Sequence, residues 1–142
     1  MVSGWVYARL VNDPQLQAIA TAQGVELPNK VWEYAAPEGA TGWQIIYQRI
    51  QASDVAGINV RLMAVLRYLI RVVDRGKDWD HETVANRIDA LFDHVGPFPV
   101  ADPPGTIEGA VRMEPFDQPE TIGGVEYRHL GGIYQIAANA GS

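Results

Sequence analysis

The sequence predicts a single α+β domain over residues 1–142, in which a small mixed or antiparallel sheet packs with two or three helices. Three observations predict it: helix-initiating residues near the N-terminus, one amphipathic segment in the middle of the chain, and several segments that alternate apolar and polar residues. With 142 residues and 47% hydrophobic types, the chain is long enough to bury one core.

Two short consecutive helices are expected at the start of the chain. Ser3 is a suitable N-cap for the first helix, and Asp13 followed by Pro14 is a strong start for the second. Gly24 marks its end. A third helix is expected between Asp80 and His94, because its apolar residues recur at helical spacing. Those residues are Val84, Ile88, Leu91 and Phe92.

The segments Val31–Tyr34 and Trp43–Gln51 alternate and predict strands, with a Pro/Gly loop over Ala36–Gly42 between them. The segment Ile58–Val73 fits a helical stripe as well as a strand, and its β-branched content favours the strand. As a strand it has one basic face and one apolar face. The basic face carries Arg61, Arg67, Arg71 and Arg75, and the apolar face carries Val60, Leu62, Leu66, Ile70 and Val72.

The C-terminal third predicts two more strands. Ile107–Met113 is strand-like, Pro115–Gly124 predicts a long turn, and Val125–Ala137 alternates until Gly131-Gly132, where we expect a bulge.

Two segments are expected to lie outside regular structure. Residues 96–106 contain four prolines and two glycines, which predicts a stiff loop that docks on a partner. Residues 138–142 are small and polar, which predicts a flexible tail.

Composition excludes several classes of function. A formal charge of −6 disfavours a dedicated nucleic-acid binder. The absence of cysteine excludes disulfides, thiolate metal sites and cysteine nucleophiles. The longest apolar run, Leu62–Ile70, is interrupted by Arg67 and is far shorter than the ~20 residues that a bilayer requires, so no membrane segment is expected.

No motif for catalysis, metal or cofactor binding is evident. His81 and His94 lie at opposite ends of the third predicted helix, roughly 20 Å apart at 1.5 Å per residue, which is too far to share an ion, and His129 is remote in sequence. No serine or threonine has the context of an activated nucleophile, and no glycine pair precedes a helix start as a phosphate loop does. We therefore expect no cofactor, no metal and no enzymatic activity.

Four stretches, read in order along the chain, carry a resemblance to a known family. They are Ala8–Leu16, the loop from Tyr34 to Gly42 with Ile45–Arg49 after it, Ala85–Leu91, and Tyr127–Tyr134. In combination, from about residue 7 to 137, the chain resembles the tail terminator family of long-tailed bacteriophages. The Pro-rich Gly96–Thr106 segment has no counterpart that we can map onto this family.

The resemblance implies a non-enzymatic α+β domain of the virion, assembled in the host cytoplasm. Such proteins form a ring, typically of six copies, on the head-proximal end of the tail tube, where they stop tube growth and dock the head connector. The implied partners are further copies of the chain, the tail tube protein and head–tail connector proteins. Six copies would carry a formal charge of −36, and we expect DNA to pass through such an acidic lumen without specific binding.

The residues expected at interfaces are exposed aromatics, stiff loops and arginines. They are Pro37, Gly39, Gly42, Trp43, Arg61, Arg67, Arg71, Pro97, Phe98, Pro99, Pro103 and Pro104. Replacing Trp43 by Ala is expected to weaken assembly more than the fold. Two alternatives remain at this stage: another head–tail joining or tail completion protein, and a small binding module that uses the arginine face.

Overall fold

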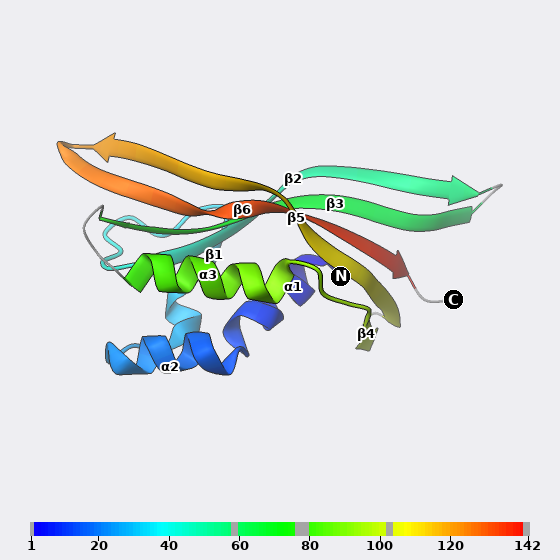
Figure 1. The fold of residues 1–142 in the computed structure, drawn as a ribbon, viewed down its shortest axis with the longest axis horizontal. Coiled ribbons are helices and arrows are strands. Elements are labelled where there is room, and N and C mark those ends of the chain that lie inside the picture. The colour runs from blue at the N-terminus through cyan, green and yellow to red at the C-terminus, as the bar shows by residue number, and fades with distance from the viewer. Residues whose placement is uncertain (1, 58–59, 76–79, 102–103, 141–142) are drawn as a thin grey trace.

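The computed structural model describes residues 2–57, 60–75, 80–101 and 104–140, and it describes no side chains at 54–57, 60–62, 75, 80 and 140. Three α-helices, a 3₁₀ helix and six strands follow one another (Figure 1). They are α1 (Val2–Val11), α2 (Pro14–Ala22), η1 (Leu27–Lys30), β1 (Val31–Glu33), β2 (Gln44–Gly57), β3 (Val60–Arg75), α3 (Asp80–Phe92), β4 (Phe98–Ala101), β5 (Pro104–Ile122) and β6 (Val125–Ala140).

The six strands form one mixed sheet in the order β1-β2-β3-β6-β5-β4. Only β1 and β2 pair in parallel, and all other neighbours are antiparallel. The predicted α+β class is therefore confirmed, but the sheet is larger than expected, because β2, β3, β5 and β6 each extend over 14 to 19 residues.

All three α-helices lie on one face of the sheet (Figure 1), which we call the helix face; the other is the open face. The core lies between the helices and the sheet. Alternate residues of β3 supply its centre, since Leu66, Tyr68, Ile70 and Val72 are buried. The apolar side of β3 is thus confirmed at Leu66, Ile70 and Val72, while the side chains of Val60 and Leu62 lie outside the described part.

The helices begin and end close to where the sequence predicts, but α1 already begins at Val2, so Ser3 lies in its first turn and is not its N-cap. Asp13 caps α2, because its side chain accepts a hydrogen bond from Leu16 N at 3.0 Å, and Pro14 occupies the first turn. Val84 and Ile88 of α3 are fully buried against the sheet. His94 lies beyond the end of α3 with a φ of 53°, and not in its last turn.

The predicted long turn at Pro115–Gly124 is wrong, because β5 continues to Ile122 and only Gly123-Gly124 make the turn. Both glycines have positive φ, as a two-residue hairpin turn requires. The prolines of β5 are tolerated because this part of the strand is at the edge of the sheet, where an N–H is dispensable.

The predicted bulge at Gly131-Gly132 is also wrong. Both glycines keep regular pairing with β3 and β5, and the register shifts lie on β5, at Ile107/Gly109 and Arg112/Glu114. Gly131 instead permits a close strand approach, because a Cβ there would lie 2.0 Å from the Ile70 carbonyl oxygen.

Two segments expected to be irregular contain strands. Within residues 96–106, β4 pairs with the start of β5, so most of the described part of this segment is paired strand at the edge of the sheet and not a loop. Within residues 138–142, β6 continues to Ala140, and Ala138 is buried.

Candidate functional site

The loop of residues 34–42 between β1 and β2 lies on the open face of the sheet. Because β1 and β2 are parallel, the chain must return along the sheet between them. Side chains anchor the loop at both ends: Trp32 Nε1 donates to Gln44 Oε1 at 2.7 Å, and Gln44 Nε2 and Lys30 Nζ both donate to the Thr41 carbonyl oxygen, at 2.9 and 2.6 Å. The loop is therefore held against the sheet.

Between the loop and the sheet lies a cavity of about 500 Å³, which we call the loop cavity. Four of the residues predicted at interfaces line it, namely Pro37, Gly39, Gly42 and Arg71. The sequence singled these residues out separately, and the fold brings them together. Gly39 and Gly42 both have positive φ, which allows the tight course of the loop.

Three ionisable groups meet on the sheet side of the loop cavity. Arg71 Nη1 donates to Gln48 Oε1 at 2.9 Å, and burial lowers the pKa of Arg71 while Glu120 opposes this shift. His129 Nε2 lies 3.4 Å from Glu120 Oε2. Burial, and then the positive charge of Arg71, lower the pKa of His129, so this imidazole is neutral at neutral pH. Sequence reasoning missed Glu120 and His129, because their meeting depends on the β5–β6 register.

The lining of the loop cavity contains no serine, threonine, cysteine or lysine. Its ionisable groups besides Arg71 and His129 are the carboxyl groups of Glu38 and Glu120 and the phenol groups of Tyr34 and Tyr127. Across the described part of the chain, no group of three or more His, Cys, Asp or Glu side chains is placed to hold a metal ion. In that same part, no helix is both long and apolar enough to cross a membrane.

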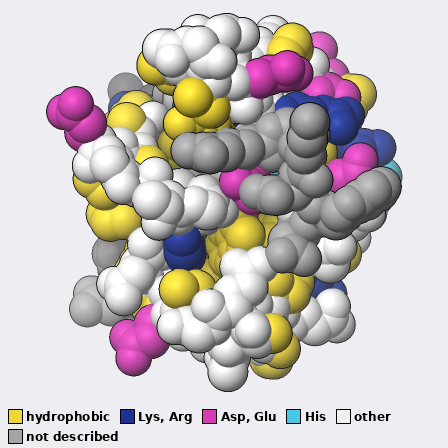
Figure 2. Space-filling model, turned by 90° about the vertical axis from the view of Figure 1, so that its left-hand side faces the viewer, with side chains coloured by type: hydrophobic (Ala, Val, Ile, Leu, Met, Phe, Trp, Pro, Cys, Tyr) yellow, Lys and Arg dark blue, Asp and Glu magenta, His cyan; other side chains and the backbone are white. Residues whose placement is uncertain are grey.

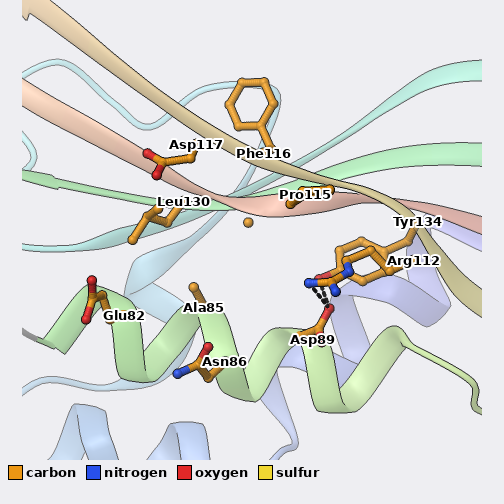
Figure 3. Close-up of a pocket in the computed structure, with 11 residues that line it drawn as sticks. Glu82, Ala85, Asn86, Asp89, Arg112, Pro115, Phe116, Asp117, Leu130 and Tyr134 are labelled. Carbon is orange, nitrogen blue, oxygen red and sulfur yellow. Dashed lines mark hydrogen bonds and ion pairs between the residues drawn. The ribbon is translucent and has the colours of Figure 1, made fainter.

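A second cavity, of about 430 Å³, lies on the helix face between α3 and the β5–β6 hairpin (Figure 3). Several of its polar groups are paired with one another: Asp89 Oδ1 accepts from Tyr134 Oη at 3.1 Å and lies 3.3 Å from Arg112 Nη1. Burial, and then Asp89, raise the pKa of Tyr134, so its hydroxyl remains a donor. Arg128 is likewise paired with Asp117. This second cavity leaves few polar groups free to recognise a ligand.

The sequence predicts that Trp43 lies on the surface, but the structure places it in the core. Its side chain is 1% exposed and belongs to the core, with Nε1 donating to Gln23 Oε1 at 2.5 Å. The expectation that Trp43 contacts a partner is wrong for this fold. Trp43 follows the loop and directly precedes β2, which begins at Gln44, and its side chain is already part of the core.

The other predicted interface residues are scattered. Phe98 is held within the chain, with the Arg9 guanidinium 4.5 Å from its ring centroid and the Trp5 ring 5.8 Å away. Pro97, Pro99 and Pro104 are exposed near β4. Pro103, and the side chains of Arg61 and Arg75, lie outside the described residues.

Arg67 and Arg71 share the open face, as the alternation of β3 predicts. Because Arg71 is bonded to Gln48 and partly buried in the loop cavity, the basic face is smaller than the sequence indicates. Within the described residues, Arg67 is the member of that face left without a hydrogen bond or ion pair.

Both outer edges of the sheet carry strand segments that no described strand covers. β1 pairs only with Ile45–Tyr47, so the outer side of β2 is uncovered from Gln48 onward. On the other side, β4 pairs with Pro104–Ile107 and Val95 bridges to Ala110, so β5 is uncovered from Val111 to Ile122. The exposed apolar residues Ile50, Met113 and Ile122 lie on these edges.

A search with models of known protein families finds no match to this chain, and a comparison with curated protein sequences finds no similar protein.

Proposed function

We propose that this chain is a structural subunit that closes into a ring, acts as a tail terminator, and caps the head-proximal end of a phage tail tube. A ring needs two different surfaces on each copy, related so that repeated contacts close by rotation. The observation that carries the proposal is the pair of uncovered edges on opposite sides of one sheet, along β2 from Gln48 and along β5 from Val111. Each edge also presents exposed apolar side chains, which monomeric proteins seldom leave on unpaired strands.

In this proposal, six copies form the ring, stop tube growth by covering the last tube subunits, and offer the opposite face to the head connector. The formal charge of −6 per copy supports a lumen through which DNA passes without binding. A lumen lined by Arg67 and Arg71 would contradict this part of the proposal. A closely related alternative is another head–tail joining or tail completion protein, which would use the same two edges.

The competing class is a small module that binds an acidic ligand through the arginine face. The hydrogen bond from Arg71 to Gln48 argues against this class. Among the described arginines of that face, only Arg67 is then without a hydrogen bond or ion pair. A salt titration separates the two classes. Binding of an anionic polymer through arginines weakens steeply with salt, whereas rings held by apolar and backbone contacts persist at moderate salt.

The decisive experiment measures the mass of the purified chain by native mass spectrometry, alone and after incubation with assembled tail tubes. We expect six-copy rings, at one end of each tube, and no further growth of capped tubes when tube protein is added. A chain that stays monomeric under both conditions, or turnover of a substrate by the lone subunit, would contradict the proposal.

A further inference from the structure

The two uncovered edges share a local irregularity. Ile50 on β2 is the unpaired residue at the register shift between Arg49 and Gln51, and Met113 on β5 is the unpaired residue at the shift between Arg112 and Glu114. A bulge of this kind redirects the side chain of the extra residue and bends the strand. Both side chains are 46% exposed, so each edge presents one redirected apolar residue to solvent.

Each bulge lies beside one charged residue that has no ion-pair partner, and these two charges are opposite in sign. Arg112, which precedes Met113, is already paired with Asp89. Arg49 precedes Ile50, and Glu114 follows Met113, and both charged residues are exposed. Within the described part of the chain, neither of them takes part in a hydrogen bond or ion pair. Each bulge is therefore an exposed apolar side chain beside an unpaired charge, positive on β2 and negative on β5.

The hairpins that contain the two bulges also differ in charge, since the β2–β3 hairpin is mainly basic and the β5–β6 hairpin is mainly acidic. Residues 48–57 and 60–69 of the β2–β3 hairpin include three arginines and one aspartate, whereas residues 114–133 of the β5–β6 hairpin include four acidic residues and one arginine. The two hairpins project in opposite directions (Figure 1). Figure 2 looks onto the end with the β5–β6 hairpin and shows acidic side chains at several places on this surface, with Lys or Arg side chains beside some of them.

We infer that the Arg49–Ile50 bulge of one copy packs against the Met113–Glu114 bulge of the next copy. This contact buries two exposed apolar side chains and pairs two free charges of opposite sign. A two-fold contact of either bulge with itself would place Arg49 against Arg49, or Glu114 against Glu114. The charges therefore favour the head-to-tail arrangement, and the inference rests on the proposed ring and names the surfaces that form it.

Side chains, more than a continuous backbone ladder, hold this contact. Pro115 and Pro119 have no N–H, so the β5 edge lacks two of the donors that a new strand would need. Both bulges also interrupt the regular edge. The contact is consequently local, which makes it sensitive to single substitutions.

Charge exchange between copies tests the contact. In Arg49→Glu both bulges are acidic, and in Glu114→Arg both are basic, so each variant alone is expected to self-associate at least about tenfold more weakly than the natural chain. Mixed in equal amounts, the two variants again offer opposite charges at every contact. We expect native mass spectrometry to show rings containing equal numbers of both variants.

Matched substitutions separate this contact from general effects of charge or polarity. Glu108→Arg makes the same charge change at another exposed, unpaired residue of β5, outside the proposed contact, and is expected to assemble normally. Ile50→Asp is expected to weaken association at least about tenfold, whereas Tyr7→Asp, at a 37% exposed residue of α1 that lies on neither edge, is expected to leave it unchanged. Circular dichroism melts confirm that each variant is folded.

The outcomes distinguish the contact from the ring itself. If the natural chain forms rings and Arg49→Glu and Glu114→Arg form them equally well, or if the mixture fails to restore assembly, the inferred contact is wrong and the proposed function stands. If the natural chain is monomeric both alone and on tail tubes, both proposals fail. Restored mixed rings, together with normal assembly of Glu108→Arg, support the contact.

Discussion

The Asp13 carboxylate accepts two hydrogen bonds from the Arg87 guanidinium, from Nη2 to Oδ1 at 2.6 Å and from Nε to Oδ2 at 2.9 Å. The same carboxylate caps α2 through Leu16 N, and Asp13 is only 5% exposed. The buried Asp13 side chain therefore caps α2 and also links it to α3, through a partner that is 74 residues away in the sequence.

Replacing Arg87 by Leu is expected to destabilise the fold. The substitution leaves the Asp13 carboxylate buried with the N-cap bond alone, and removing one partner of a buried ion pair costs about 3 kcal/mol. Urea unfolding followed by circular dichroism measures the loss. Arg128→Leu, which breaks the exposed pair with Asp117, is the matched control and should cause a clearly smaller loss; equal losses would contradict the role of Asp13.

Acid is expected to destabilise the chain through Asp13. Burial by itself raises the pKa of Asp13, but the hydrogen bonds from Arg87 and Leu16 and the nearby arginine charges outweigh it and lower the pKa. The unfolded chain then binds a proton more readily than the folded chain. The stabilisation is complete above the unfolded value of about 4 and is lost as the pH falls through the folded pKa. Asp13→Asn should flatten stability against pH in this range.

His129 is expected to add a second, milder acid sensitivity. Burial and Arg71 lower its pKa below the usual 6.5, so between the two values the unfolded chain binds more protons. Stability should therefore begin to fall as the pH drops below about 6.5 and level off below the folded pKa. His129→Gln should remove this slope in chemical unfolding experiments.

Local signals allowed the helices to be predicted from sequence. The Asp13 side chain and the Pro14 ring both favour the start of α2 at this point. The apolar stripe that includes Val84 and Ile88 indicates which side of α3 is buried. The end of β5 could not be predicted in this way. Pro115 and Pro119 indicate a turn locally, and only the neighbouring strands determine that this side of β5 is an edge.

The candidate site was predicted only in pieces. Pro37 and Gly39 belong to one loop and could be grouped from the sequence, but their approach to Arg71 depends on the β2–β3 register. Trp43 was misplaced because the residue that accepts its indole N–H, Gln23, is twenty residues away and lies at the end of α2. The bulges at Ile50 and Met113 carry no residue pattern that marks them.

Trp43→Ala is expected to damage the fold itself. Trp43 is among the largest fully buried side chains, and removing it leaves a cavity and takes away the indole N–H that donates to the Gln23 amide oxygen. Large aromatic-to-alanine changes in a core cost about 3–5 kcal/mol. Chemical unfolding should show this loss, with Trp43→Phe intermediate; a Trp43→Ala chain as stable as the natural one would contradict the assignment to the core.

Gly131→Ala is expected to disturb the centre of the sheet. The new Cβ would lie 2.0 Å from the Ile70 carbonyl oxygen and 2.7 Å from the Arg71 Cα, and both are backbone atoms that cannot move without shifting β3. We expect a loss of more than about 2 kcal/mol in the free energy of unfolding. Gly132→Ala meets the Tyr134 side chain at 3.0 Å, which can adjust, so its cost should be smaller.

Gly4→Ala provides the opposite control, because nothing lies within 4 Å of a Cβ there and α1 gains a better helix former. Its stability should rise by up to about 1 kcal/mol. If Gly131→Ala matched Gly4→Ala in urea unfolding, the close approach of β6 to β3 would be wrong. A loss at Gly131 alone, with unchanged ring formation in the folded protein, would show that this glycine serves the sheet and not the contact between copies.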